Sequence, residues 1–366
     1  MVPIINEFYS GLGDIPFVSL GNYPSSIEKL EKMGEYVNVP DLYIKRDDCC
    51  HYIYGGNKVR KLEYILADAK EKNRELLITL GAVGSNQVLA TGIHGGNEGF
   101  DVMGIVMDQP NADYIRKNLL LDYHFGIELV YTRNILEELL MSGWKYFINS
   151  LRGRKPYYIP PGASSAIGNL GFVNAIFELK SQIDRGDIPE PDYIIAPAAS
   201  LGTVAGLNLG CKLLEMNTQV ISVGVAMPWM VTTSRLVSIS NNICKFMRRY
   251  DENIPKIRCT KKDIILLDEF LGKGYAYITK EGYETVKEMR RLEGIPLEPT
   301  YTGKALNGGL RWLKKQGEHG KTILFWNTYN SIDLEDLIKN RAYHVLPSQF
   351  HKYYETSTQE ELIEKK

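Results

Sequence analysis

Short apolar segments alternate with longer segments of helical periodicity, and this alternation most limits what the chain can fold into. Strands are predicted at residues 75–81, 101–107, 127–131, 192–198, 219–227, 263–267 and 321–327. Helices are predicted between them, notably at 86–99, 111–126, 203–215, 280–294 and 302–320. Strands that alternate with helices form parallel sheets with both faces covered. The strands outnumber those of one ordinary compact sheet, so two α/β domains are expected.

The composition excludes several classes of protein. Of the 366 residues, 44% are hydrophobic and 24% are charged, and the formal net charge is -1. Without a basic excess, no nucleic-acid partner and no membrane surface is expected. The apolar runs are too short to cross a bilayer, and residues 1–16 lack the two regions of a signal peptide. The polar residues 353–366 are expected to fray.

The cysteines indicate a reducing compartment. There are five, at irregular spacing: Cys49, Cys50, Cys211, Cys244 and Cys259. An odd, scattered set argues against a disulfide framework, so a cytoplasmic location is expected. Adjacent Cys49, Cys50 and His51 do not match the usual spacing of metal ligands, and no partner pair follows, so no metal is predicted.

Two small polar loops follow predicted strands, at residues 80–87 (LGAVGSNQ) and 197–206 (PAASLGTVAG). Ligands of parallel α/β sheets bind at the carboxyl ends of the strands. The second loop combines hydroxyl groups with the unpaired amides of a helix N-terminus, which suits an anion such as phosphate. The alternative is a routine strand-to-helix turn that Ser or Thr caps. Neither loop contains the GK[ST] sequence of a P-loop that binds nucleoside triphosphates. Neither contains a good G-x-G-x-x-G fingerprint of a dinucleotide site.

Lys58 stands at the mouth of a predicted helix in the segment YIYGGNKVRKLEYILADAK, residues 52–70. The helix dipole disfavours a cation there. Lys58 is therefore either an ordinary solvated side chain or an amine with a chemical task. An amine, a phosphate loop and hydroxyl groups together suit pyridoxal phosphate.

The segment IKRDDCCHYIYGGNKVRKLE, residues 44–63, resembles the signature of a family of pyridoxal-phosphate enzymes. This family comprises D-cysteine desulfhydrase and 1-aminocyclopropane-1-carboxylate deaminase. Further segments match it in order: PSSIEKL, GAVGSNQ, NLLLD, YYIPPGASSAIGNLGFVNAIFEL, ASLGTVAGL and LEGIPLEPTYTGKALNGGL. The resemblance runs from about Pro24 to about Thr328, and the combination of these motifs is specific.

The resemblance implies the tryptophan synthase β-like fold, fold type II. Two open, twisted parallel-sheet α/β domains would hold pyridoxal 5'-phosphate between them. The small domain would be inserted at residues 62–172, and the large domain would comprise residues 1–61 and 173–366. The resemblance also implies a homodimer that acts on a small amino acid.

The resemblance assigns four residues to catalysis. Lys58 matches the Schiff-base lysine, which can serve as the base at the substrate Cα once it is freed. Ser85 matches the serine that binds the substrate carboxylate. Tyr301 matches the tyrosine that reaches the substrate, and Tyr275 matches a second tyrosine of the site. A packed structural aromatic is the alternative for Tyr275.

Other matching positions would bind the cofactor. Asn57 belongs to the Lys58 turn, Asn86 would bond the ring hydroxyl, and Thr328 would lie near the pyridine nitrogen. The phosphate loop would consist of Ser200, Leu201, Gly202 and Thr203. A neutral partner at the ring nitrogen gives a weaker electron sink, which favours prompt β-elimination over transamination.

Three departures from the family pattern bear on the substrate. Gln87 replaces the usual histidine after the Ser-Asn pair and is assigned to substrate binding together with Ser85 and Asn86. Leu201 lies where glycine is usual, so its side chain must be accommodated. Asn327-Thr328-Tyr329-Asn330 replaces a His-Thr-Gly-Gly sequence. Cofactor binding should survive these changes, because amides and hydroxyl groups remain.

Three functions follow from this comparison. Thr302 after Tyr301 matches the desulfhydrases, whereas the deaminases have glutamate there. We therefore expect β-elimination of D-cysteine or a related amino acid to pyruvate, ammonia and the leaving group. The alternatives are opening of 1-aminocyclopropane-1-carboxylate to 2-oxobutanoate and ammonia, and a catalytically silent relative that binds an amino acid. Retention of Lys58, Ser85, Asn86 and Tyr301 argues against the silent relative.

Overall fold

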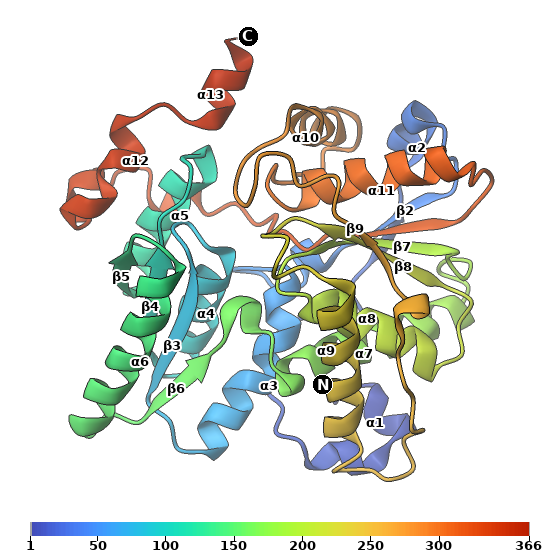
Figure 1. Cartoon of the computed structure of the whole chain (residues 1–366), viewed down its shortest axis with the longest axis horizontal. Helices are drawn as coiled ribbons and strands as arrows, with labels where there is room; N and C mark the ends of the chain where they lie inside the picture. Colours follow the sequence, from blue (N-terminus) through green and yellow to red (C-terminus); the bar gives the residue numbers. More distant parts are fainter. Residues whose placement is uncertain (1, 366) are drawn as a thin grey trace. The chain divides into compact units, whose positions relative to one another are not determined.

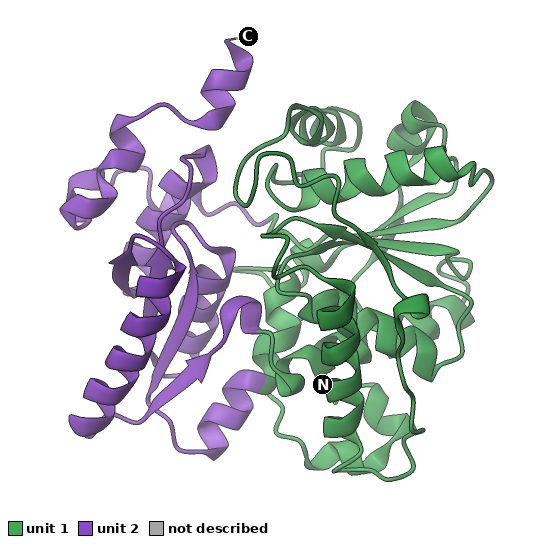
Figure 2. Ribbon diagram, viewed as in Figure 1, with its two compact units in different colours: residues 1–64, 164–331 green, residues 65–163, 332–366 purple. Residues whose placement is uncertain are grey.

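The computed structural model describes residues 2–365, which form two compact units. Unit 1 comprises residues 1–64 and 164–331, and unit 2 comprises residues 65–163 and 332–366 (Figure 2). None of the helices within residues 2–365 is long and apolar enough to span a membrane.

Unit 1 is built on a six-stranded sheet in the order β1-β2-β10-β7-β8-β9. Its strands are β1 (Ile27–Lys29), β2 (Leu42–Lys45), β7 (Tyr193–Ala198), β8 (Gln219–Gly224), β9 (Ile265–Leu267) and β10 (Ile323–Trp326). The edge strand β1 is antiparallel to β2, and the other pairs are parallel. The alternation of the sequence thus leads to a parallel sheet with one reversed edge strand, a common arrangement.

Helices cover both faces of this sheet, which is why its central strands are apolar throughout. One face carries α7 (Ala166–Asp184), α8 (Gly202–Leu213) and α9 (Thr233–Met247), and the other carries α2 (Glu31–Val37), α10 (Lys280–Glu293) and α11 (Thr302–Gln316) (Figure 1). Short α1 (Ile5–Phe8) packs against α7. The two faces have separate apolar cores.

Unit 2 contains a four-stranded parallel sheet in the order β5-β4-β3-β6. Its strands are β3 (Leu76–Ala82), β4 (Asp101–Met107), β5 (Glu128–Thr132) and β6 (Pro156–Ile159). The helices are α4 (Asn86–Asn97), α5 (Asp113–His124), α6 (Ile135–Leu151), α12 (Lys352–Glu355) and α13 (Gln359–Glu364). The helix α3 (Asn57–Glu71) begins in unit 1 and ends in unit 2.

The grouping into units differs from the predicted domain division in three segments. Residues 62–64 of α3 lie in unit 1, where the small domain was predicted to begin at residue 62. Residues 164–172 lie in unit 1, because α7 is one continuous helix that packs along α8. Residues 332–366 lie in unit 2, where Arg116 of α5 bonds the carbonyl oxygens of Tyr353 at 2.9 Å and Thr356 at 2.8 Å. The polarity of this segment suggested a frayed end. In the structure, residues 352–364 are largely helical and are anchored by these hydrogen bonds.

Candidate cofactor site

Lys58 is the second residue of α3, directly behind a turn that only glycines can make. Gly56 has a φ of 93°, a backbone conformation that residues other than glycine rarely adopt. A Cβ atom on Gly56 would lie 2.8 Å from the carbonyl oxygen of Tyr329 and 2.9 Å from that of Thr328. On Gly55 it would lie 2.3 Å from the Asp48 carbonyl oxygen. The two glycines therefore let the chain pass between two loops and deliver Lys58 at the start of the helix.

Three of the predicted cofactor-binding segments meet at this turn. The Lys58 ammonium donates to Asn57 Oδ1 at 2.8 Å, and Asn57 Nδ2 donates to Thr203 Oγ1 at 3.2 Å. The Asn57 amide donates to the Thr328 carbonyl oxygen at 3.2 Å. Asn57 thus links the lysine to both the α8 loop and the loop after β10.

The late loop that departs from the family pattern has a structural task. The side chain of Asn330 accepts a hydrogen bond from the Gly55 amide at 2.8 Å. Asn327 Oδ1 accepts from the Tyr329 amide at 3.3 Å. Asn330 therefore holds the Gly55–Gly56 turn, and Asn327 bonds within its own loop. The contact between Asn330 and Gly55 is visible only in three dimensions.

The surroundings of Lys58 raise the share of its neutral form above that of an ordinary lysine. Burial lowers the pKa of Lys58 from its usual 10.5 to about 8, and the Glu298 carboxylate opposes part of this shift. With such a pKa, about a tenth of the amines are neutral at pH 7. A neutral amine is the form that attacks an aldehyde or accepts a proton.

The loop between β7 and α8 is shaped for close approach of a ligand to its backbone. Leu201 has a φ of 71°, and its side chain is buried in the core, which resolves how this residue replaces a glycine. A Cβ atom on Gly202 would lie 2.0 Å from Asn169 Oδ1 and 2.3 Å from Ser164 Oγ, so no side chain fits there. Ser164 Oγ also donates to the Ser200 carbonyl oxygen at 3.3 Å.

Helix α8 begins at Gly202, so its first amides have no partner within the helix. Such a helix start can bind a phosphate without a charged side chain. The loop residues Ser200 to Thr203 therefore offer amides, two hydroxyl groups and a positive dipole end.

The two predicted tyrosines contact each other in unit 1. The hydroxyl groups of Tyr275 and Tyr301 are 2.7 Å apart, and their rings meet edge to face at 6.2 Å. Tyr275 is thus more than an isolated packed aromatic. Because the two hydroxyl groups share a hydrogen bond, the orientation of one depends on the other.

Glu298 organises the turn that carries Tyr301, and sequence reasoning did not identify it. Its carboxylate accepts the amides of Thr300 at 2.8 Å, Tyr301 at 2.8 Å and Thr302 at 2.6 Å. Burial raises the pKa of Glu298, and these amide donors oppose the shift. Thr302 is fully buried and its hydroxyl donates to the Glu298 carbonyl oxygen at 3.0 Å.

Ser85, Asn86 and Gln87 lie together in unit 2, where β3 ends and α4 begins. Ser85 caps α4, because its hydroxyl oxygen accepts the Gln87 amide at 3.2 Å. Asn86 Oδ1 accepts from Asn118 Nδ2 at 3.1 Å. The buried Gln87 side chain donates to Thr91 Oγ1 at 2.8 Å, and within residues 2–365 its Oε1 has no hydrogen-bond partner. Their predicted roles toward substrate and cofactor stay predictions.

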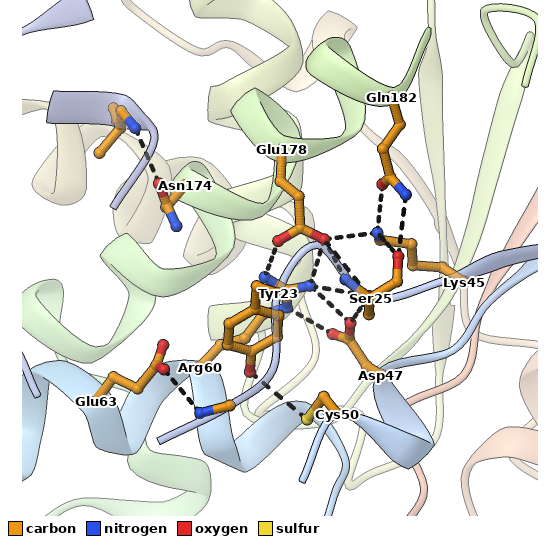
Figure 3. A network of polar contacts seen from close by, with 12 residues as sticks. Tyr23, Ser25, Lys45, Asp47, Cys50, Arg60, Glu63, Asn174, Glu178 and Gln182 are labelled. Atoms are coloured by element: carbon orange, nitrogen blue, oxygen red, sulfur yellow. Dashed lines mark hydrogen bonds and ion pairs between the residues drawn. The ribbon is translucent and has the colours of Figure 1, made fainter. Parts of the chain in front are cut away.

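A buried network of charges is centred on Arg60 of α3, two residues after Lys58 in the sequence, and the sequence reasoning missed it (Figure 3). Arg60 bonds Asp47 at 2.7 Å and Glu178 at 2.8 Å, and Lys45 bonds Glu178 at 2.6 Å. All four side chains are almost completely buried. The indole of Trp326 adds a 2.7 Å hydrogen bond to Asp47. The network ties α3 to the end of β2, to α7 and to β10, which fixes the start of α3.

These features fit pyridoxal phosphate. Lys58 offers an amine with a lowered pKa to an aldehyde, and the start of α8 offers unpaired amides to a phosphate group. By contrast, the described residues 2–365 contain no group of three or more His, Cys, Asp or Glu side chains that could hold a metal ion.

A family model described as "Pyridoxal-phosphate dependent enzyme" matches residues 18–328. A D-cysteine desulfhydrase of Yersinia enterocolitica is 30% identical, over 87% of this chain and 94% of its own length. A Pyrococcus horikoshii protein, provisionally named as a 1-aminocyclopropane-1-carboxylate deaminase, is 34% identical over 88% of this chain and 94% of its own length.

Solved structures of other proteins are also similar to this chain. The crystal structure of an ACC deaminase homologue has a TM-score of 0.76 and 32% identity, over 93% of this chain and 99% of that one. Threonine deaminase isoform 2 from Solanum lycopersicum, with 17% identity, a TM-score of 0.56 and 86% of each chain covered, shares the fold. The predicted fold type and the dependence on pyridoxal phosphate are thereby confirmed. The chain belongs to the pyridoxal-phosphate dependent enzymes.

Proposed function

We propose that the enzyme eliminates the β substituent of D-cysteine or a related small amino acid, giving pyruvate, ammonia and the leaving group. The observation that carries this proposal is the Lys58 amine, with its pKa of about 8, bonded through Asn57 to the α8 loop. Thr302 in place of glutamate favours elimination over ring opening. A relative named D-cysteine desulfhydrase supports the same choice.

Four residues of the chain would have separate roles in the reaction. When bound, pyridoxal phosphate supplies the electron sink that makes the Cα proton of an amino acid acidic. The neutral Lys58 amine would take this proton, after which the bond from Cβ to sulfur breaks. Tyr301 would reach the substrate, with Tyr275 holding its hydroxyl in place. Ser85 would bind the substrate carboxylate.

The cofactor would be held by groups that leave the chemistry at Lys58 unobstructed. The start of α8, with Ser200, Leu201, Gly202 and Thr203, would bind the phosphate through amides and hydroxyl groups. Asn86 would bond the ring hydroxyl, and Thr328 would lie near the ring nitrogen. Gln87 would border the substrate.

Ring opening of 1-aminocyclopropane-1-carboxylate is the second candidate. It is favoured by the Pyrococcus horikoshii relative and by the ACC deaminase homologue, both named for that activity. A homodimer in the cytoplasm completes the proposal. The cytoplasmic location rests on the cysteines, which are all free thiols.

A product assay separates the candidates. The purified enzyme, saturated with cofactor, would receive D-cysteine, L-cysteine, β-chloroalanine, serine or 1-aminocyclopropane-1-carboxylate at equal concentrations. We expect sulfide and pyruvate from D-cysteine and little 2-oxobutanoate from the cyclopropane. Lys58→Ala, treated identically, serves as the blank. Efficient ring opening without elimination from D-cysteine would reverse the order of the two candidates.

A further inference from the structure

Helix α6 of unit 2 turns most of its large apolar side chains outward, while Met141 packs against the core of the sheet. Five large ones, each more than half exposed, lie within a sector of about 80° at 100° per residue. They are Leu136, Leu140, Trp144, Phe147 and Leu151. Neighbouring Leu139 is 51% exposed and widens the strip. We call these six residues the α6 strip.

The inward side of α6 has the opposite character. Glu138, Ser142 and Asn149 are buried there, on the side of the helix opposite the α6 strip. Burial raises the pKa of Glu138 to about 7, although the Gly81 amide opposes this shift. A surface helix normally buries its apolar side and exposes its polar side. The reversed pattern indicates that something outside the chain covers the α6 strip.

The size of the α6 strip fits a protein interface. Six side chains of this kind, each more than half exposed, present on the order of 700 Å² of apolar surface, which exceeds the largest patch of most monomers. A standard interface buries roughly 800 Å² on each partner.

The α6 strip is symmetric along the helix, which identifies the partner. Leu136 and Leu151 are equally far in sequence from the midpoint between Gly143 and Trp144, and so are Leu140 and Phe147. Two antiparallel copies of α6 would therefore set each leucine or phenylalanine against an apolar residue of the other copy. A two-fold axis produces such a self-complementary contact.

Gly143 is a second, independent sign of a close helix crossing. It is exposed in the middle of α6, where glycine costs roughly 1 kcal/mol relative to alanine. A Cβ atom there would meet nothing within 4 Å, so nothing in this chain requires a glycine. At the midpoint of the α6 strip, a missing side chain lets two helices approach closely.

We propose that two copies of this chain pair through the α6 strip, with their α6 helices antiparallel about a two-fold axis near Gly143. The antiparallel arrangement also brings the N-terminal end of each helix dipole, with Glu137, near the C-terminal end of the other, with exposed Arg152. This proposal names the interface and is independent of the substrate.

The test is the mass in solution of the enzyme and of two variants. Sedimentation equilibrium should give twice 41.5 kDa for the unchanged enzyme at micromolar concentration. Phe147→Glu places a charge in the α6 strip, and Gly143→Gln fills the crossing point with a side chain that the monomer has room for. Both should raise the dissociation constant at least about 100-fold while far-UV circular dichroism stays unchanged. Leu362→Glu, which alters an exposed leucine of α13, is the matched control and should stay dimeric.

Two results would overturn the proposal. One is an unchanged enzyme that is monomeric at 100 times that concentration. The other is a dimer that survives both substitutions, because the interface would then lie elsewhere. Flotation with vesicles of phosphatidylcholine and phosphatidylserine completes the test. Binding of a monomeric enzyme to these vesicles, abolished by Phe147→Glu, would assign the α6 strip to a membrane surface.

Discussion

At the residue scale, Lys58 combines two properties that a solvated lysine lacks. It is held by Asn57 in a fixed position at the start of α3, and its pKa is lowered to about 8 by burial. A lowered pKa means that the neutral amine persists to lower pH than in an ordinary lysine. This property belongs to the chain itself and can be measured without turnover.

We therefore predict the labelling of Lys58 in enzyme freed of cofactor. The rate of acetylation should rise with pH through a midpoint near 8, because only the neutral amine reacts. Lys29, whose pKa is raised above its usual value by its hydrogen bond to Asp41, is the internal comparison and should show its midpoint at clearly higher pH than Lys58. Peptide mass spectrometry at a series of pH values provides both curves. Equal midpoints for the two lysines would refute the lowered pKa.

Glu298 acts on the neighbouring turn as a buried acceptor for three amides. We predict that Glu298→Ala lowers the free energy of unfolding by at least about 2 kcal/mol, because these donors lose their acceptor. Glu288→Ala, which breaks the contact of a partly exposed carboxylate with exposed Arg291 on α10, should cost less than about 1 kcal/mol. Urea denaturation measures both values. A loss for Glu298→Ala no larger than that for Glu288→Ala would show that the turn does not depend on it.

At the element scale, the start of α8 and the start of α3 depend on very different interactions. The start of α8 relies on the absence of a side chain at Gly202. The start of α3 relies on the four buried charges of Arg60, Asp47, Glu178 and Lys45. Each arrangement leads to its own prediction.

For α8, Gly202→Ala should weaken cofactor binding at least about tenfold, since the new Cβ displaces Asn169 or Ser164 and moves the helix start. The matched control is Gly96→Ala on α4, where a Cβ meets nothing within 4 Å. Titration of cofactor-free protein with pyridoxal phosphate, followed by absorbance, gives both affinities. An unchanged affinity in Gly202→Ala protein of intact fold would remove this loop from the phosphate site.

For α3, Arg60→Met should cost about 3–5 kcal/mol, because it leaves two buried carboxylates short of a partner. Lys155→Met breaks the exposed pair with Glu75 and should cost less than about 1 kcal/mol. Chemical denaturation at pH 7 compares them. Similar losses for both variants would mean that the network does not stabilise unit 1.

The same network predicts how stability depends on pH. Burial alone would raise the pKa of Glu178, but the charges of Arg60 and Lys45 outweigh it and lower the pKa to about 2. A depressed carboxyl pKa contributes stability that is complete above the unfolded value of about 4.5 and is lost as the pH falls toward 2. Arg60→Met should flatten the stability curve in this range.

At the scale of the whole molecule, the sequence predicted most of the strands, including the three-residue β9, and the two-sheet architecture, because apolar runs alternate with helical segments there. It did not predict β1, β2 or β6. The first is only three residues long, β2 ends in the buried Lys45, and β6 begins with Pro156, all of which weaken the pattern of a strand. Their places are decided by neighbours that are distant in the sequence.

For the candidate site, the motifs predicted Lys58, the α8 loop and the two tyrosines, and their roles stay predictions. The structure adds the contacts of Asn57 with Thr203 and of Tyr275 with Tyr301. The charge network and Glu298 could not be predicted. Partners in the network lie up to 279 positions apart in the sequence, and the Glu298 carboxylate bonds backbone amides. Runs of charge inside apolar segments, such as IKRDD and VRKLE, were the only signal.

The attachment of the cofactor to Lys58 is the central claim, and borohydride reduction tests it most directly. The cofactor-loaded enzyme would be reduced, digested and analysed by peptide mass spectrometry, with Lys58→Ala as the control. We predict the pyridoxyl mass on the peptide that contains Lys58 and on no peptide of the variant. Lys61 and Lys304 also have pKa values that burial lowers. Finding the label on either of them, with Lys58 unmodified, would contradict the account.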